Sequence, residues 1–324
     1  MAALSIAFFA LAALVIVGTF LPLIPTHAGI VRICDFPRPQ LLVGGVAALI
    51  GLLLTSSWHA PYHWVAAALL VPAVLYQALR IWPFTPLMPA SRLSQARPED
   101  PTFSVLIANV KQTNRKAEGL LHLLKTYDPD LVFIVEIDDW WKSQLQPVAE
   151  RYPHVTALPQ DNGYGVLFMT RLTIETCEIR RLVREEIPSL RAKLGLASGD
   201  SFWFYGLHPE PPGPAQDAED RDAELMIVAR EMRDDGDASL VAGDLNDVAW
   251  SRTTASFRRI AKAEDPRRGR GLYATFHADY WFARWPLDHL FHTREFATHE
   301  LQVLPHIGSD HFPVYARLSY VGKK

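Results

Sequence analysis

The uneven placement of charge constrains the fold of this chain more than any other feature of its sequence. The chain has 324 residues, yet its first 82 residues contain only four charged side chains. Three apolar stretches lie in this region, at Leu4–Ile24, Leu41–Ser56 and Trp64–Trp82. Each is close to the roughly 17 to 25 residues that a helix needs to cross a bilayer. The pattern predicts a three-helix transmembrane anchor over residues 1–82.

Two other interpretations of the apolar stretches remain open. A cleaved signal peptide would explain the first stretch, but no Lys or Arg precedes it and no small-residue cleavage site follows it. A buried bundle of soluble helices would need polar faces, and none is visible in the three stretches. Composition therefore favours membrane spans over both alternatives.

The arginines of this region bear on the orientation of the anchor. They lie in the first loop, at Arg32 and Arg38, and at or after the end of the third stretch, at Arg80, Arg92 and Arg97. The loop Trp58–His63 has no Lys or Arg. The positive-inside rule therefore favours a multi-pass cell-membrane protein with its carboxyl-terminal domain in the cytoplasm. Five charges are a small basis, so the side of the membrane is left open.

The charge of the remaining chain excludes one function class. The chain has 32 basic and 35 acidic residues, of which residues 1–100 hold five and three, so 27 basic and 32 acidic residues remain beyond them. Non-specific DNA binding depends on neutralising phosphates with many basic groups. A domain with a net charge of −5 is not a general nucleic-acid-coating protein. Only Cys34 and Cys177 are present, and they imply no disulfide framework.

A Pro-rich segment separates the anchor from the rest of the chain. Its prolines, Pro83, Pro86, Pro89 and Pro98, exclude a continuous helix. Residues 83–101 are therefore predicted to be a linker that lets a globular domain, residues 102–324, stand off the membrane. No partner protein is inferable from either part.

Residues 102–324 alternate between buried apolar runs and amphipathic stretches. The predicted strands are Phe103–Ala108, Leu131–Val135, Val155–Leu158, Gly165–Met169, Thr173–Val183, Leu190–Leu196, Phe202–Leu207, Ser239–Ala242, Leu287–His292, Ala297–Val303 and Val314–Leu318. The predicted helices are Arg115–Tyr127, Trp140–Arg151 and Ala215–Asp234. Mixed sheets covered by helices are the simplest packing of these elements, which predicts an α/β sandwich.

Polar side chains follow three of these strands directly. Asn109 ends the first strand, Glu136 follows the second, and His208 follows the strand Phe202–Leu207. Each alone is more often a turn, cap or structural residue than a catalytic one. Together they would place hydrogen-bonding and titratable groups at the edge of a sheet.

Two carboxyl-terminal motifs are more specific. In the first, Asp244 and Asn246 lie two apart after a buried strand, so extended geometry would point both side chains the same way. The second is Ser309-Asp310-His311. Asp288 lies in an apolar strand, where an unpaired carboxylate is costly, and His311 is its natural partner. Carboxylate and amide oxygens suit Mg²⁺ or Mn²⁺ rather than Zn²⁺, and such an ion assists phosphate ester cleavage.

These residues resemble the endonuclease/exonuclease/phosphatase superfamily, which has the fold of deoxyribonuclease I, over about residues 102–320. The resemblance implies a four-layer α/β sandwich, and the three-helix amino part looks like the membrane-anchored bacterial members. It further implies that Glu136 is the principal ligand of Mg²⁺ or Mn²⁺, with Asn109 and Asp310 completing or supporting its shell. The implied catalytic residues are Asp244 for the water, Asn246 for a phosphoryl oxygen, His311 oriented by Asp288, and His208 as phosphate contact or general acid.

The middle strands depart from some nucleases of this family. Those nucleases carry an additional carboxylate or tyrosine there, whereas this chain offers Tyr164 and Asn162. Tyr164 is therefore a candidate substrate contact, and deoxyribonuclease-like DNA cutting does not follow. The resemblance implies a membrane-anchored phosphoesterase whose substrate is nucleic acid or a phospholipid headgroup.

Other interpretations are weighed against this one. A calcineurin-like metallophosphatase shares the Gly243-Asp244 motif, but its upstream Asp-x-His and its Gly-Asn-His motifs are missing. A catalytically inactive membrane-tethered binding domain of the same fold would have lost at least one expected residue, and none is lost. Six basic residues either frame the substrate or form a solvated surface: Arg258, Arg259, Lys262, Arg267, Arg268 and Arg270. Arg221 is predicted to be a partner in a surface ion pair on its helix.

Overall fold

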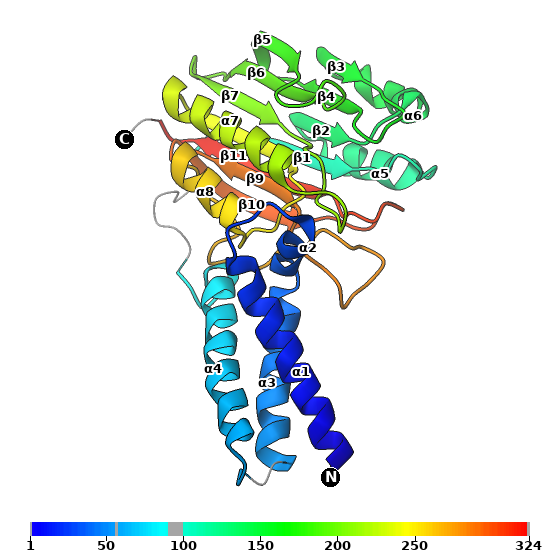
Figure 1. The fold of residues 1–324 in the computed structure, drawn as a ribbon. Helices are drawn as coiled ribbons and strands as arrows, with labels where there is room; N and C mark the ends of the chain where they lie inside the picture. Colours follow the sequence, from blue (N-terminus) through cyan, green and yellow to red (C-terminus); the bar gives the residue numbers. More distant parts are fainter. Residues whose placement is uncertain (1, 56–57, 90–99, 323–324) are drawn as a thin grey trace.

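Three long helices form a stalk beneath a domain built on two sheets (Figure 1). The computed structural model describes residues 2–55, 58–89 and 100–322. The stalk consists of α1 (Ala2–Phe20), α3 (Arg38–Thr55) and α4 (Pro61–Ile81). All three are long and apolar enough to cross a membrane, as the sequence predicts. Their surfaces expose large apolar side chains, including Leu14 and Leu79, which suits contact with lipid rather than water.

Glycines allow the stalk helices to approach one another closely. A Cβ atom on Gly51 of α3 would lie 2.3 Å from the ring of Phe8 on α1. One on Gly45 would lie 2.6 Å from Val74 of α4. Small residues at such contacts are typical of helix packing within membranes.

Short segments at the domain-side end of the stalk join it to the domain. They are η1 (Leu21–Leu23), α2 (Gly29–Arg32), η2 (Ile33–Asp35) and η3 (Trp82–Phe84). The Nε1 atom of Trp250 donates a hydrogen bond to the carbonyl of Asp35 at 2.8 Å. The backbone N–H of Gly269 donates to the carbonyl of Pro83 at 2.9 Å. The stalk and the domain are thus joined by hydrogen bonds between segments far apart in the sequence.

The first residues of the predicted linker do not hold the domain away from the stalk. Phe84 is buried in a cluster with Val248, Trp250 and Leu287 of the domain. Burial of a large aromatic side chain stabilises that contact, so the first linker residues pack on the domain instead of holding it away. Residues 90–99, with Arg92, Arg97 and Pro98, lie outside the described residues. The exact division into anchor, linker and domain stays a prediction.

Eleven strands of the described chain form two sheets, and each corresponds to a strand predicted from the sequence. The first sheet has the order β10-β11-β1-β2-β4-β3 and the second the order β5-β6-β7-β8-β9. The bounds are β1 (Thr102–Asn109), β2 (Leu131–Val135), β3 (His154–Leu158), β4 (Val166–Thr170), β5 (Thr173–Arg180), β6 (Ser189–Gly195), β7 (Ser201–Gly206), β8 (Ser239–Asp244), β9 (Asp288–His292), β10 (Phe296–Val303) and β11 (Val314–Tyr320).

Alternation along the strands produces four layers. Val105 and Ile107 of β1 lie in the core between the two sheets. Leu106 and Ala108 point to the other face and pack with α5 (Glu118–Tyr127) and α6 (Asp139–Ala149). The second sheet is covered in the same way by α7 (Glu219–Asp235) and α8 (Arg252–Ala261). Side chains of a strand alternate between its faces, so each sheet packs on the other sheet with one face and on helices with the other. The fold is therefore the predicted α/β sandwich.

Helix α8 is not among the predicted helices. It begins after Ser251, whose Oγ accepts a hydrogen bond from the backbone N–H of Thr254 at 2.9 Å. Serine is a favoured residue at this position because its oxygen satisfies an otherwise unpaired N–H. The sequence therefore carries a start signal for α8, although the region is interpreted from sequence only as a group of basic residues.

Candidate active site

One edge of the paired sheets collects the ends of six strands. Strands β1 and β2 are parallel, as are β7 and β8, so their carboxyl ends lie together. Strand β9 runs antiparallel to β8, and its first residue, Asp288, pairs with Asp244. Strand β11 runs antiparallel to β1, so the segment before it also reaches this edge. Topology thus brings together polar residues that are far apart in the chain.

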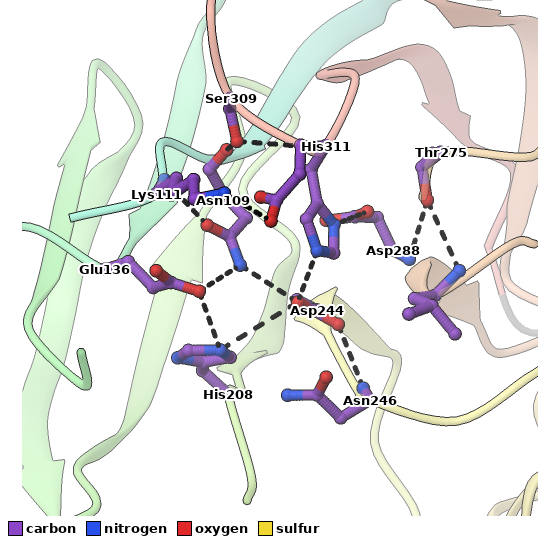
Figure 2. A network of polar contacts seen from close by, with 12 residues as sticks. Asn109, Lys111, Glu136, His208, Asp244, Asn246, Thr275, Asp288, Ser309 and His311 are labelled. Carbon is purple, nitrogen blue, oxygen red and sulfur yellow. Dashed lines mark hydrogen bonds and ion pairs between the residues drawn. The ribbon is translucent and has the colours of Figure 1, made fainter. Parts of the chain in front are cut away.

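Asn109 lies at the centre of the resulting network (Figure 2). Its side-chain N–H₂ donates to Glu136 Oε1 at 2.6 Å and to Asp244 Oδ2 at 3.0 Å. Its Oδ1 accepts from the backbone N–H of Lys111 at 2.9 Å. In this conformation Asn109 holds two carboxylates from different sheets in place.

Glu136 presents its carboxylate to the network from a left-handed backbone conformation, with φ of 62°. Such a conformation is uncommon for a residue with a side chain, and it is often found at functional sites. Burial raises the pKa of Glu136, and the hydrogen bonds from Asn109 and Gln112 only partly oppose it. The negative charge of the Glu136 carboxylate is therefore only partly stabilised by its neighbours.

His311 and Asp288 form a buried pair. His311 Nδ1 lies 2.8 Å from Asp288 Oδ2, and its Nε2 lies 3.5 Å from Asp244 Oδ2. Burial lowers the pKa of His311, but the carboxylates of Asp288 and Asp244 outweigh it and raise the pKa to about 10. The imidazole is therefore positively charged at neutral pH, with Nε2 directed at Asp244 and the open site (Figure 2).

His208 differs from His311 in its charge. Its Nε2 lies 3.9 Å from both Glu136 Oε1 and Asp244 Oδ2, and its Nδ1 has no partner among the described residues. Burial lowers the pKa of His208. The charge of Asp244, 3.9 Å away, opposes this effect but does not outweigh it. This histidine is neutral and directs Nε2 at the same two carboxylates.

Asn246 is positioned by its own backbone. Its backbone N–H donates to Asp244 Oδ1 at 2.9 Å, and its side-chain N–H₂ donates to the carbonyl of Pro209 at 2.9 Å. The preceding Gly243 has φ of 140°, and a Cβ there would lie 2.0 Å from the carbonyl oxygen of Leu207. Glycine is therefore required for β8 to deliver Asp244 and Asn246 to the site.

A cavity of about 380 Å³ opens over these residues. Of the predicted site residues, seven line it: Glu136, Tyr164, His208, Asp244, Asn246, Asp310 and His311. The other two, Asn109 and Asp288, are buried behind it and bond to residues that line it. The Tyr164 ring lies 5.5 Å from the His208 ring, and burial raises its pKa to about 12, so the phenol stays neutral. All nine predicted residues are thus brought together.

The donor set suits a hard divalent cation. Glu136 and Asp310 present carboxylates to the same cavity, and the half-buried Glu136 has no cationic partner in hydrogen-bond contact within the part of the chain that the structure describes. A cation bound there would relieve that cost, and oxygen ligands are the type that Mg²⁺ and Mn²⁺ prefer. The residues therefore fit the metal that the resemblance implies.

A second group of possible ligands lies beside the first. Ligand atoms of Asp244, Asp288 and His311 lie within 4.8 Å of one another, so by distance this group could also hold a metal. However, His311 is protonated and bonded to Asp288, and a protonated imidazole nitrogen cannot bind a metal. The group is better suited to binding a phosphoryl oxygen.

Several residues of the site escape prediction from sequence. Lys111 Nζ forms an ion pair with Asp310 Oδ2 at 2.9 Å. Ser309 Oγ donates to the carbonyl of Asn109 at 2.8 Å and so ties the Asp310 segment to β1. Phe36 of the anchor and Phe276 line the cavity. The serine lies within a motif already noted, but no sequence signal connects Phe36 to a site in another domain.

Arg221 is not the surface residue predicted from the sequence. It is buried, at 1% exposure, and its Nη1 donates to the carbonyl of Asn246 at 2.8 Å. Its guanidinium also bonds to Asp222 and lies 3.6 Å from Asp247. Arg221 therefore supports the loop that carries Asn246, and the prediction is wrong because a carbonyl from a distant turn meets the helix here.

The interpretation of the six basic residues as a frame for the substrate is also wrong at this site. None of the six is among the described residues that line the active-site cavity. Arg267 is buried and paired with Asp265 at 2.8 Å, and Arg270 donates to two backbone carbonyls. These contacts give the arginines structural roles, while Arg259 faces a different pocket.

Comparisons with known proteins agree with this fold. No curated protein matches the chain. Among solved structures, it is similar to D. rerio TDP2 complexed with single strand DNA product, at 18% identity over 68% of this chain and 100% of that chain, with a TM-score of 0.57. It is also similar to the Bacteroides thetaiotaomicron mannosyl-6-phosphatase, at 18% identity over 67% and 100%, with a TM-score of 0.55.

The human Nocturnin catalytic domain with bound sulfate is similar at 15% identity over 68% of this chain and 95% of that chain, with a TM-score of 0.56. At such identities these likenesses show the fold alone. A family model described as the Endonuclease/Exonuclease/phosphatase family matches residues 106–311, which is more than half of the chain. The chain therefore belongs to the Endonuclease/Exonuclease/phosphatase family.

Proposed function

We propose that the protein is a membrane-anchored, Mg²⁺- or Mn²⁺-dependent phosphoesterase that acts on the headgroup of a membrane lipid. The observation that carries the proposal is the shared cavity. Carboxylates suited to a cation, a charged histidine and a residue of the membrane anchor, Phe36, all line it. A catalytically inactive binding domain is the alternative, but all nine expected residues are retained and oriented around one cavity.

Glu136 and Asp310 would hold the cation, with Asn109 supporting Glu136. When bound, the cation supplies polarisation of a phosphoryl oxygen and neutralises developing charge. The ion pair between Lys111 Nζ and Asp310 Oδ2, at 2.9 Å, holds that carboxylate at the site. Lys111 would move aside or remain as a second positive charge near the phosphate.

The chain's own groups would carry the remaining steps. Asp244 would orient the attacking water and accept its proton, since its carboxylate lies between His208, His311 and Asn109. His311, charged and held by Asp288, would donate from Nε2 to a phosphoryl oxygen and stabilise the transition state. Asn246 would donate a further hydrogen bond, and neutral His208 would contact the phosphate from the other side.

The position of the cavity favours a substrate at the membrane surface. Phe36 lies between α2 and α3, and its ring packs 5.9 Å from Trp285 of the domain. Trp285 Nε1 and the carbonyl of Phe282 both hydrogen-bond to the side chain of Gln40, in the first turns of α3. The loop before β9 is thus held beside the start of a candidate membrane span, Arg38–Thr55.

The same loop exposes three consecutive aromatic side chains. Tyr280, Trp281 and Phe282 are 51%, 82% and 59% exposed, a costly arrangement in water but a typical one in the interfacial region of a bilayer. Their backbone continues directly to Phe276, which lines the cavity. We therefore infer that the mouth of the site is held at the headgroup layer.

The described arginines near the domain-side end of the stalk are Arg32, Arg38 and Arg80. We infer a cytoplasmic domain from them. A reporter that is active in only one compartment, fused after Lys324, is expected to be active in the cytoplasm. Activity on the opposite side would reverse this orientation without affecting the site.

Hydrolysis by the full chain in mixed micelles is expected to require Mg²⁺ or Mn²⁺. The substrates to compare are a phospholipid, its soluble headgroup ester, single-stranded DNA, RNA and a simple phosphomonoester. Tethering raises the effective concentration of a lipid substrate, so kcat/KM is expected to favour the lipid by roughly 10²-fold. Turnover that survives thorough chelation would refute metal dependence, and a preference for DNA or RNA would refute the lipid assignment.

A further inference from the structure

A second pocket lies between the stalk and the domain, away from the active site. It has a volume of about 360 Å³ and is lined by the domain-side ends of the stalk helices and by α8. Figure 1 shows α8 above the domain-side end of α4. Leu23, Tyr76 and Arg80 line it from the stalk, while Arg252 and Arg259 line it from the domain.

One face of α8 is built to line this pocket. Arg252, Ala255, Ser256 and Arg259 have the spacing i, i+3, i+4 and i+7, which places them on a single helix face. The opposite face carries Phe257, which is buried in the core beneath the second sheet. Small side chains between the two arginines leave room for a ligand that both could contact.

The pocket carries more positive charge than the protein neutralises. Four arginines line it, Arg38, Arg80, Arg252 and Arg259, together with one carboxylate, Asp35. Asp35 is already engaged by Arg38 at 2.5 Å and by Arg32 at 3.2 Å.

The remaining three arginines have little or no pairing. The side chains of Arg252 and Arg259 are exposed and make no hydrogen bond or ion pair with any residue that the structure describes. Arg80 donates to the carbonyl of Trp250, but its buried Nε has no partner among the described residues. The pocket therefore has donors directed into it and no anion of its own.

The pocket also lies at a defined depth. The candidate spans end at Leu23 and begin at Arg38, so these residues mark the boundary between apolar and polar layers. Beside the arginines, Leu23 lines the pocket and Leu79 precedes Arg80 on α4; they are 49% and 72% exposed and offer apolar surface for acyl chains. Guanidinium groups bind phosphate oxygens in pairs of hydrogen bonds, and basic pockets between membrane helices suit anionic headgroups.

We propose that this pocket binds the phosphate headgroup of an anionic phospholipid from the surrounding leaflet. The bound lipid bridges α8 to the ends of α1 and α4, and so stabilises the domain on its stalk. This site is separate from the cavity that holds Glu136 and His311, because the two pockets share no lining residue.

Thermal unfolding of the full chain in neutral detergent tests the proposal. Phosphatidylglycerol added to the micelles is expected to raise the melting temperature, and phosphatidylcholine is not. The double variant Arg252→Ala/Arg259→Ala is expected to lose this rise and to bind phosphatidylglycerol at least tenfold more weakly. Because both arginines are exposed, the double variant should fold normally.

A matched double variant, Arg233→Ala/Arg294→Ala, removes two exposed arginines elsewhere on the domain and is expected to retain the full rise. Ser256→Glu places a carboxylate between the arginines and is expected to abolish the rise as well. An undiminished rise in both pocket variants overturns the proposal. An equal rise with inorganic phosphate in place of the lipid shows an anion site and overturns the lipid assignment.

Discussion

Replacing His311 with Gln is expected to lower kcat/KM for phosphate-ester hydrolysis by roughly 10³-fold, in the range of losses seen when a preorganised donor to a developing negative charge is removed. His311 combines a buried position with a positive charge, because Asp288 and Asp244 raise its pKa to about 10. Gln retains a hydrogen-bond donor of similar size but carries no charge. Steady-state kinetics on whichever substrate the full chain cleaves provide the measurement.

Asp288→Asn separates the charge of this pair from its shape. Asn can still accept a hydrogen bond from His311 Nδ1, but it no longer favours the charged imidazole. A smaller loss is expected, of roughly 10²-fold. His299→Gln is the matched control, since the ring of His299 on β10 hydrogen-bonds, among the described residues, to Ser319 on β11, away from the site. Wild-type kinetics in His311→Gln, or an equal loss in the control, would remove His311 from the mechanism.

Strand ends are the part of this site that sequence predicts well. Asn109, Glu136 and Asp244 each follow a short, continuous apolar run, and such a run is typical of a strand buried on both faces. Parallel pairing brings the ends of β1 and β2 together, and the packing of the two sheets brings the end of β8 to the same edge. The partnership of Asp288 with His311 is predictable for another reason, since a carboxylate in a buried strand needs a partner.

The remaining features depend on contacts between distant segments. The exposed or buried state of Arg221 depends on a carbonyl of Asn246, which no local pattern reveals. Phe36 reaches the active-site cavity only because the stalk docks on the domain through Trp250 and Trp285. Prolines correctly predict a break after α4, but not that Phe84 packs on the domain. Local periodicity determines elements, whereas docking depends on surface complementarity.

Glu136→Gln is expected to have opposite effects on activity and on stability. Loss of the principal carboxylate should weaken Mg²⁺ binding and lower kcat/KM by roughly 10³-fold at limiting metal, a loss comparable to that of other transition-state contacts. In metal-free protein, however, the Glu136 carboxylate is half-buried and has no cationic partner in hydrogen-bond contact among the described residues, and its pKa is raised. Ionised Glu136 therefore costs folding free energy above its unfolded pKa, and the neutral amide removes that cost.

The thermal stability of the two proteins with and without metal distinguishes a ligand from a structural residue. With chelator present, the Glu136→Gln variant should melt at a higher temperature than the wild type. On addition of Mg²⁺, the wild type should gain stability by mass action and the variant should not. Glu150→Gln at the exposed end of α6 is the control and should change neither value. A residue selected for metal binding leaves the empty site less stable, so its removal should raise the melting temperature in chelator. A variant that melts lower than the wild type in chelator would instead show that Glu136 stabilises the fold through Asn109 and Gln112.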